Sequence, residues 1–200
     1  GSRDEGPGQT GLAHFFEHMM FEGSARVAKM EHLSALEAVG AEVNANTSTD
    51  RTYYYAVVPS SALALTLWLE GERWRDLTLT PERIENQRQA VLEERRESYD
   101  NKPFAAAQIE LARLVFGNPA LQHPTIGETQ DVAQAPTAAF AQFWRSWYAP
   151  GNAVLCLVGD VDPQQARQLQ VEVAQLLVVL AVRVFCGFFW GGGGLFGLGG

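Results

Sequence analysis

The segment His14-Phe15-Phe16-Glu17-His18 constrains the fold of this chain more than any other stretch of it. Residues i, i+3 and i+4 share one face of a helix, so His14, Glu17 and His18 are expected to project side by side. Two histidines one turn apart can bind one Zn²⁺, which takes imidazole nitrogens at about 2.0–2.1 Å. The carboxylate between them can accept a proton from a water molecule at the metal. The segment therefore predicts a helix that carries two metal ligands and a general base.

A third ligand is expected, because a catalytic zinc site needs three protein ligands and one open position. Residues 81–101 are predicted to form a long helix, with Thr80 as N-cap and Pro81 at the first helical position. This helix carries the carboxylates Glu82, Glu85, Glu93, Glu94 and Glu97. Glu–Arg pairs on a solvated helix explain most of them, and spacing alone does not identify which one turns inward.

Further motifs follow in order along the chain. They are residues 40–47, which end in Asn44-Ala45-Asn46-Thr47, residues 86–96 around Glu93-Glu94, and residues 98–101, 124–127, 148–153 and 158–160. Together with residues 14–24, these motifs resemble the pitrilysin family of zinc metallopeptidases, which includes insulin-degrading enzyme and the mitochondrial processing peptidase. The H-x-x-E-H order is that of the inverzincins. The resemblance runs from the first residue to about Gln175 and is to the N-terminal catalytic half of the family.

The resemblance implies a complete zinc centre. The third ligand of the family is a glutamate at a set spacing after the second histidine, and this spacing leads to Glu94. The implied site is one Zn²⁺ per chain bound by His14, His18 and Glu94, with Glu17 as the general base. Many members carry another glutamate two helical turns before the third ligand, where this chain has Gln87. Gln87 can support a ligand through a hydrogen bond but adds no negative charge.

The remaining pattern predicts an α+β domain, in which helices pack on a mixed, mostly antiparallel sheet. Hydrophobic periodicity, caps and turn residues divide the chain into elements. Helices are predicted over residues 10–21, 29–39, 60–74, 81–101, 104–116, 136–147 and 163–174, and strands over residues 41–46, 52–58 and 153–158. Residues 117–129 are expected to form a loop. The apolar strand at 153–158 is expected to be buried, and Cys156 with it.

The strand at residues 41–46 is the predicted substrate-binding element. By resemblance it borders the active-site cleft, where Asn44, Ala45, Asn46 and Thr47 contact an extended peptide substrate. Strand addition at a sheet edge relies on main-chain hydrogen bonds and therefore tolerates many peptide sequences. An ordinary hairpin strand with outward polar residues is the alternative that the sequence leaves open.

The other two histidines, His32 and His123, are not expected to bind the metal. His32 is interpreted as a surface residue of the helix at 29–39. His123 precedes a proline in a loop, and it is interpreted as a packing or hydrogen-bonding residue. Neither is expected to be a ligand.

Composition narrows the class of protein further. The chain has 200 residues and a net charge of −8 at pH 7. This length suits one domain, and the acidic balance argues against binding to nucleic acid, which requires a basic surface. The two cysteines, Cys156 and Cys186, provide no disulfide framework.

Residues 176–200 differ from the rest of the chain, because they are apolar as far as Trp190 and then rich in glycine. The apolar stretch is shorter than the ~20 residues that span a membrane, and Arg183 near its middle is costly there. No membrane span is expected, although a tail anchor is the alternative. We expect a metallopeptidase domain over residues 1–175, which lacks the first strand of the family fold, followed by a tail outside the domain.

The predicted function is that of a zinc-dependent endopeptidase that cleaves peptides or unfolded segments. By resemblance, its partner is a second homologous half, either in the same chain or in a separate subunit, and the isolated chain is expected to hydrolyse peptides poorly. A non-catalytic partner or structural subunit of such an assembly is one alternative, and a non-functional fragment is another. The resemblance alone favours the bacterial periplasm or cell envelope.

Overall fold

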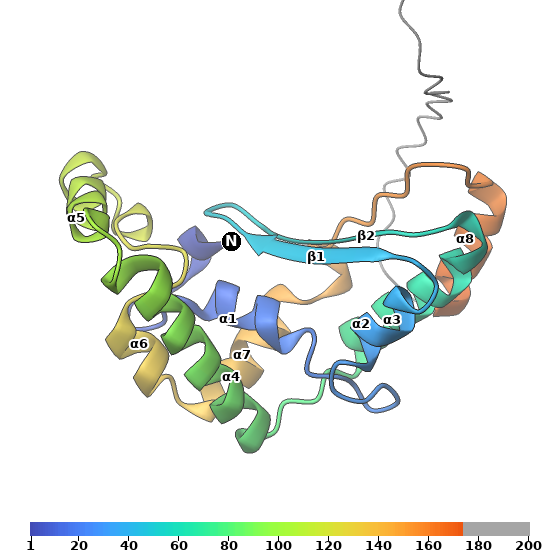
Figure 1. The fold of residues 1–200 in the computed structure, drawn as a ribbon, viewed down its shortest axis with the longest axis horizontal. Helices are drawn as coiled ribbons and strands as arrows, with labels where there is room; N and C mark the ends of the chain where they lie inside the picture. The colour runs from blue at the N-terminus through green and yellow to red at the C-terminus, as the bar shows by residue number, and fades with distance from the viewer. Residues whose placement is uncertain (174–200) are drawn as a thin grey trace, which may run out of the picture.

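The computed structural model describes residues 1–173, in which helices surround a β-hairpin (Figure 1). The helices are α1 (Leu12–Met19), α2 (Glu31–Glu37), α3 (Leu63–Arg75), α4 (Pro81–Arg95), α5 (Ala105–Val115), α6 (Thr129–Gln134), α7 (Thr137–Trp147) and α8 (Pro163–Val173). The strands are β1 (Glu42–Thr47) and β2 (Thr52–Val57), and a π-helical turn at Arg96–Asp100 continues α4. The predicted α+β class is confirmed. The predicted tail at residues 176–200 lies outside the described residues.

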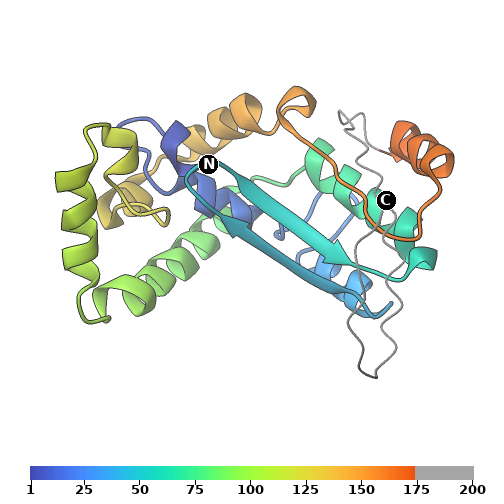
Figure 2. The ribbon, with the colours of Figure 1, turned by 90° about the horizontal axis from the view of Figure 1, so that it is seen from above.

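The hairpin is a two-stranded antiparallel sheet, in which Glu42 pairs with Val57 and Thr47 pairs with Thr52. Aromatic and β-branched residues in β2 favour extended structure. Figures 1 and 2 show the hairpin lying across the helices, and α1 packs against it. Exposed residues alternate with half-buried ones along β1, because only every second side chain of a strand points towards the helices.

Aromatic packing fixes α1 from behind. Phe15, Phe16 and Met19 on its inner face are fully buried, and the Phe15 ring lies 4.6 Å from the Phe140 ring of α7, edge to face. Full burial of a Phe or Met side chain contributes about 1.5–3 kcal/mol. The opposite face of α1, which carries the H-x-x-E-H side chains, therefore has one fixed orientation.

Tyr54 of β2 attaches the hairpin to this core. Its hydroxyl shares a hydrogen bond of 2.8 Å with the Tyr148 hydroxyl and donates to the Phe16 carbonyl oxygen at 3.4 Å. These contacts hold β1 and β2 at a set height above α1.

α4 packs against α1 and α6 with a face that is partly polar. Ile84 and Val91 are buried, and so are Arg88 and Arg95. Both guanidinium groups donate to backbone carbonyl oxygens of residues 127–135, which include α6. Such bonds satisfy buried carbonyl groups that need a partner. The apolar residues of α4 in the sequence do not reveal that Arg88 and Arg95 also face inward. The helix α6 is not among the predicted helices.

The surface interpretation of His32 is wrong. His32 is 2% exposed, and its Nε2 lies 3.5 Å from Glu70 Oε1 of α3. α2 packs against α3, and His32 lies with Leu36 on the buried face of this short helix. The amphipathic pattern of α2 alone cannot distinguish a buried polar pair from a solvated face.

Residues 153–158 do not form the predicted buried strand. Only Leu155 is in an isolated bridge, and side chains in the segment alternate between exposed and half-buried. Val154 and Val158 are 75% and 70% exposed, and Cys156 is exposed as well. A continuous apolar run predicts that the side chains on both faces of the strand are buried. Within residues 1–173, only the side chains on one face are partly buried.

Candidate metal centre

A buried carboxylate holds the start of α1. Glu5 accepts hydrogen bonds from the backbone N–H groups of Ala13 at 2.6 Å and Gly11 at 2.8 Å, which a helix N-terminus otherwise leaves unpaired. Burial raises the pKa of Glu5 to about 8, although these two N–H groups act to lower it. Gly11 has a φ of +90°, and a Cβ there would lie 2.5 Å from the Ile126 carbonyl oxygen. Glycine is therefore needed where α1 begins.

Three side chains converge on the open face of α1. His14 and His18 come from α1, and Glu94 comes from the adjacent α4. His14 Nε2 lies 3.5 Å from Glu94 Oε1, and His18 Nε2 lies 3.2 Å from Glu94 Oε2. One ligand atom from each residue lies within 4.8 Å of the other two. A tetrahedral ion with ligands at about 2.0–2.2 Å separates its ligand atoms by roughly 3.3–3.6 Å. The two histidine–glutamate distances of 3.5 and 3.2 Å are close to this separation, so these residue types and distances suit Zn²⁺.

The charges of this cluster favour a cation. Hydrogen bonds from His14 and His18 hold the pKa of Glu94 well below its usual value. Burial acts to lower the pKa of His18, but the hydrogen bond and charge of Glu94 and the charge of Glu17 together raise it. No lysine or arginine in the described part of the chain pairs with Glu94. Its negative charge is therefore shared only with groups that can also bind a metal.

β1 holds the carboxylate of Glu17. Thr47 Oγ1 donates a hydrogen bond to Glu17 Oε2 at 2.6 Å and lies 3.2 Å from Thr52 Oγ1. The sequence predicts Thr47 only as a substrate-binding residue, whereas its hydroxyl contacts the candidate base. The period-two alternation that turns Ala45 and Thr47 towards the helices is the signal that could have revealed this contact.

Gln87 of α4 lies beside a buried acid and lines the same cavity as His18. Its Nε2 donates to Glu22 Oε1 at 2.6 Å. Glu22 is buried and is not among the site residues predicted from the sequence. Its position four residues after His18 is a signal that could have pointed to it.

A cavity of about 280 Å³ opens beside the cluster. The residues that line it are Glu17, His18, Phe21, Glu22, Met30, Leu33, Val43, Asn44, Ala45 and Gln87. The candidate base and one candidate ligand therefore face the same space as β1. Asn44 and Asn46 are exposed, while Ala45 and Thr47 are half-buried. Among the described residues β1 pairs only with β2, so the other edge of β1 is free.

The model of the insulinase family, peptidase family M16, matches residues 1–129 of this chain. The chain belongs to this family. A second family model, that of the M16 inactive domain, matches residues 137–174. The resemblance found in the sequence is therefore confirmed.

Relatives of this M16 chain carry the names of zinc proteases. An uncharacterised zinc protease of Streptomyces coelicolor is 34% identical over 163 residues, which are 81% of this chain and 35% of the relative. The chain thus spans about a third of the length of that protein.

Solved M16 structures share the fold. A protease from Helicobacter pylori has a TM-score of 0.83 and 29% identity, covering 86% of this chain and 42% of that protein. The first half of the periplasmic protease PqqL from Escherichia coli has a TM-score of 0.75 and 26% identity, covering 86% of this chain and 38% of that structure.

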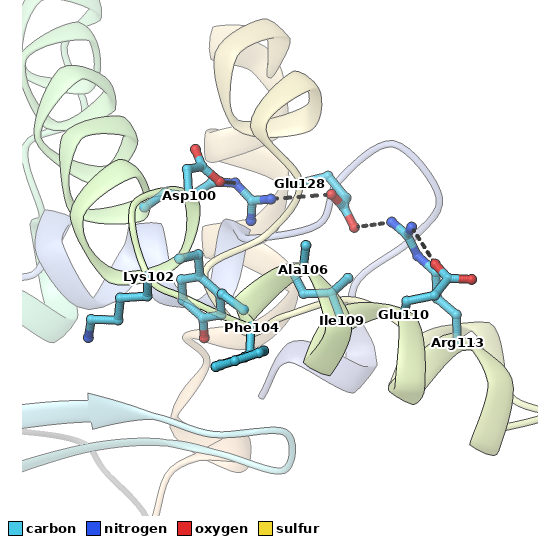
Figure 3. A pocket seen from close by; sticks show the side chains of 11 residues that line it. Asp100, Lys102, Phe104, Ala106, Ile109, Glu110, Arg113 and Glu128 are labelled. Carbon is cyan, nitrogen blue, oxygen red and sulfur yellow. Dashed lines mark hydrogen bonds and ion pairs between the residues drawn. The ribbon is translucent and has the colours of Figure 1, made fainter.

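The larger cavity of this M16 chain, about 640 Å³, is lined by residues from the end of α4, α5 and the loop before α6. None of the residues of the metal cluster lines it. Figure 3 shows Asp100, Glu128, Arg113 and Glu110 in a chain of ion pairs that also includes Arg95. These charges are satisfied by one another, so this cavity offers no counterpart of the cluster on α1.

The remaining predictions concern His123 and the membrane. His123 Nδ1 lies 3.8 Å from Glu5 Oε2, at the start of α1 and apart from the three converging side chains. Within residues 1–173, every helix is too short or too polar to cross a membrane.

Proposed function

We propose that this chain is the catalytic N-terminal half of a zinc-dependent endopeptidase that cleaves peptides or unfolded segments. His14, His18 and Glu94 hold one Zn²⁺ per chain, and Glu17 is the general base. The observation that carries the proposal is the convergence of three ligand atoms within 4.8 Å, next to a glutamate that faces the adjoining cavity. Membership of the M16 family and the zinc-protease names of its relatives support the same function.

A zinc ion held by His14, His18 and Glu94 would supply Lewis-acid chemistry for the peptide carbonyl and would lower the pKa of the attacking water. The chain's own residues move the proton. Glu17 accepts it from the water and delivers it to the leaving amine. Thr47 holds the Glu17 carboxylate by the 2.6 Å hydrogen bond, so the base starts the reaction in position. Fixing a reacting group in this way removes part of the entropic barrier.

The substrate lies along the free edge of β1 in this proposal. An extended peptide pairs with the backbone of residues 44–47, and one of its side chains enters the 280 Å³ cavity. Phe21, Met30 and Leu33 on the cavity wall favour an apolar or aromatic side chain there. Asn44 and Asn46 point to solvent along the same strand, where they can bond the peptide or its side chains.

Efficient hydrolysis requires a second homologous half, in the same chain or as a partner subunit. The chain spans about a third of the length of its Streptomyces coelicolor relative, and an M16 protease has been solved as a first half. The described residues offer three candidate ligands and a candidate base, and we identify no further donor among them for a developing oxyanion. Loss of one such donor typically lowers kcat by about 10²–10³-fold. The periplasmic relative favours a bacterial periplasm or cell envelope as the location.

A non-catalytic partner subunit is the competing function, and a non-functional fragment is the remaining alternative. Three converging ligands with an adjacent base favour the catalytic half, because a structural subunit needs none of these groups. Stoichiometric zinc binding by the folded chain would favour the catalytic half over the non-catalytic subunit and the non-functional fragment.

The test has two parts. Elemental analysis of the folded chain is expected to give about one zinc per chain, and its absence from well-folded protein would contradict the proposal. A fluorogenic unstructured peptide is then assayed with this chain alone and with the longer parent protein. We expect kcat/KM to be at least about 100-fold lower for the chain alone. Comparable values would show that no second half is needed.

A further inference from the structure

Met30 has a backbone conformation that its residue type rarely adopts. Its φ is +62°, in the left-handed region, and within residues 1–173 the only other residue with a positive φ that is not glycine is Phe104. This region is strained for a residue with a Cβ atom and unstrained for glycine. The Met30 side chain is also 48% exposed. Strain and the exposure of a large apolar group both oppose folding, and glycine at this position would avoid both.

Hydrogen bonds hold Met30 in this conformation. Its N–H donates to the Phe21 carbonyl oxygen at 3.2 Å, and its own carbonyl oxygen accepts from the Ser34 N–H at 3.1 Å. The preceding residue, Lys29, pairs through Nζ with Oε1 of the buried Glu22 at 2.9 Å. Strained residues persist where the surrounding structure fixes them, and they are frequent at sites that contact ligands. The strain at Met30 is therefore a fixed feature of the loop between α1 and α2.

Met30 belongs to the wall of the 280 Å³ cavity beside the metal cluster. Glu17 and part of β1 line the same cavity. A peptide that pairs with β1 and has its scissile bond at Glu17 therefore places a neighbouring side chain there. A cavity of about 150 Å³ is enough to hold a benzene ring in a protein core, so this one has room for an aromatic side chain. The other apolar residues of the wall are Phe21, Leu33 and Val43.

We propose that Met30 is a specificity-determining residue, which selects an aromatic side chain next to the scissile bond of the substrate. The inference rests on the proposed peptidase function and adds the residue class that its cavity takes. A thioether makes favourable contacts with an aromatic ring that an aliphatic side chain cannot make, and the Phe21 ring on the same wall adds an aromatic pair. A bound ring also removes the exposed Met30 side chain from water. Substrate binding thus uses the side chain whose presence opposes folding.

The deciding variant is Met30→Gly, which removes the side chain and relieves the backbone strain. Two peptides that differ only in Phe or Ala beside the scissile bond are compared, and mass spectrometry confirms the bond that is cut. The ratio of kcat/KM for the Phe peptide to that for the Ala peptide is expected to fall at least about 10-fold. The denaturation midpoint is expected to stay level or rise, because glycine adopts this φ without strain. A purely structural residue would give the opposite pattern, a lower midpoint with an unchanged ratio.

Two control variants separate the side chain from the backbone. Met30→Leu keeps an apolar wall of similar volume but lacks sulfur, so the ratio should fall less than in Met30→Gly. Phe104→Gly relieves the same kind of strain at a residue of the other cavity (Figure 3), and the ratio should stay within about twofold. A fall in Phe104→Gly as large as that in Met30→Gly would show that the effect does not come from the cavity wall.

Both peptides compete in one reaction with the zinc-loaded longer parent protein, so the ratio does not depend on the fraction of active enzyme. Absence of zinc-dependent cleavage of either peptide would refute the proposed function itself. Cleavage without a preference for Phe over Ala, or with the same preference in Met30→Gly, would overturn only the role of Met30. If Met30→Gly does not fold, Met30→Asn decides. Asparagine tolerates the left-handed region and makes the wall polar, so the same fall in the ratio is expected and an unchanged ratio overturns the proposal.

Discussion

Within residues 1–173, the histidine–glutamate clusters on α1/α4 and on α2/α3 differ in one neighbour. On α1 and α4, His14 and His18 face Glu94, whose side chain is 41% exposed. Between α2 and α3, His32 faces Glu70, but Arg73 also binds Glu70 with hydrogen bonds of 2.6–2.9 Å and is only 3% exposed. In the first cluster, neither lysine nor arginine pairs with Glu94 among the described residues. In the second cluster, the charge of Glu70 is neutralised by Arg73.

The pKa shifts follow from this difference. Burial acts to raise the pKa of Glu70, but Arg73 and His32 outweigh it and lower the value to about 2. Burial lowers the pKa of His32, so this ring is held neutral. At the first cluster, Glu94 raises the pKa of His18 against the effect of burial. Identical residue types can thus form a structural ion pair or a candidate metal site, and the presence of an arginine decides which.

The largest expected contrast is in zinc binding. His18→Ala or Glu94→Gln should lower zinc affinity by more than about 100-fold, beyond the cost of losing an outer partner. His32→Ala should leave it within about threefold, because Arg73 already occupies the cation position at Glu70. Isothermal titration of the folded variants measures this. Glu93→Gln is the matched control on α4, since neighbours on a helix point about 100° apart. Zinc loss in Glu93→Gln or His32→Ala would remove the distinction between the clusters.

A second contrast separates the base from the ligands within the first cluster. Glu17→Gln should keep zinc and lower kcat by about 10²–10⁴-fold, the usual contribution of a general base. The reason is that Glu17 lies beside the ligand set and not in it. Peptide hydrolysis by the longer parent protein and zinc content of the same samples are measured together. Zinc loss in this variant would mean that Glu17 is a ligand.

The second cluster should respond in stability and not in metal binding. Arg73→Met leaves the Glu70 carboxylate inside the fold without its cation, and removing one partner of a buried pair costs about 3–5 kcal/mol. Chemical denaturation of the metal-free protein measures this loss. Arg96→Met, which removes an exposed partner of Glu93 on the surface, is the control and should cost less than about 1 kcal/mol. A loss of the same size in both variants would contradict the structural role of Arg73.

Acid should weaken the second cluster in two steps. The pKa of His32 in the folded protein is below its ordinary value of 6.5, so its contribution is present above pH 6.5 and is lost as the pH falls below it. The pKa of Glu70 falls from 4.5 to about 2, so its contribution is lost between these values. A shift of this size corresponds to roughly 3 kcal/mol, at about 1.4 kcal/mol per unit. Urea denaturation from pH 7 to 3 should show a shallower loss in Glu70→Gln, and equal slopes would refute this assignment.

The smallest effect is expected where the hairpin meets the first cluster. Thr47→Val removes the hydroxyl that donates to Glu17 and keeps the shape of the side chain. A hydrogen bond to a charged group contributes about 1.5–3 kcal/mol, so kcat should fall about 10–100-fold while KM and zinc content stay near parental values. Thr47→Ser retains the hydroxyl and should restore most of kcat. A change in KM alone would assign Thr47 to substrate binding, as the sequence predicts.

Local patterns were sufficient wherever the chemistry was local. The spacing of His14, Glu17 and His18 predicts one helical face, and Thr80 and Pro81 predict the start of α4, where Thr80 Oγ1 does accept from Arg83 N–H. The strand-forming tyrosines and the polar turn between the strands predict both strands of the hairpin within one or two residues. Each of these signals depends on neighbours a few positions apart, which the backbone geometry of a helix or strand brings together without help from the rest of the fold.

Other features depended on contacts between distant segments. Glu94 is identified only by the family resemblance, because the local sequence does not distinguish it from the other four carboxylates on the predicted helix at residues 81–101. The burial of His32, the inward turn of Arg88 and the exposure of residues 153–158 each follow from which element packs on that face.

From the sequence follow a two-histidine helix, a hairpin, a glutamate-rich helix and, by resemblance, Glu94 as the third ligand. The tertiary structure adds the distances of 3.5 and 3.2 Å between Glu94 and the two histidines. It alone reveals that Thr47 contacts Glu17 and that Glu22 is buried against Gln87. Periodicity determines the directions in which side chains leave one helix or strand. It does not determine the distance between side chains of different elements, and the strength of charge interactions and hydrogen bonds depends on that distance.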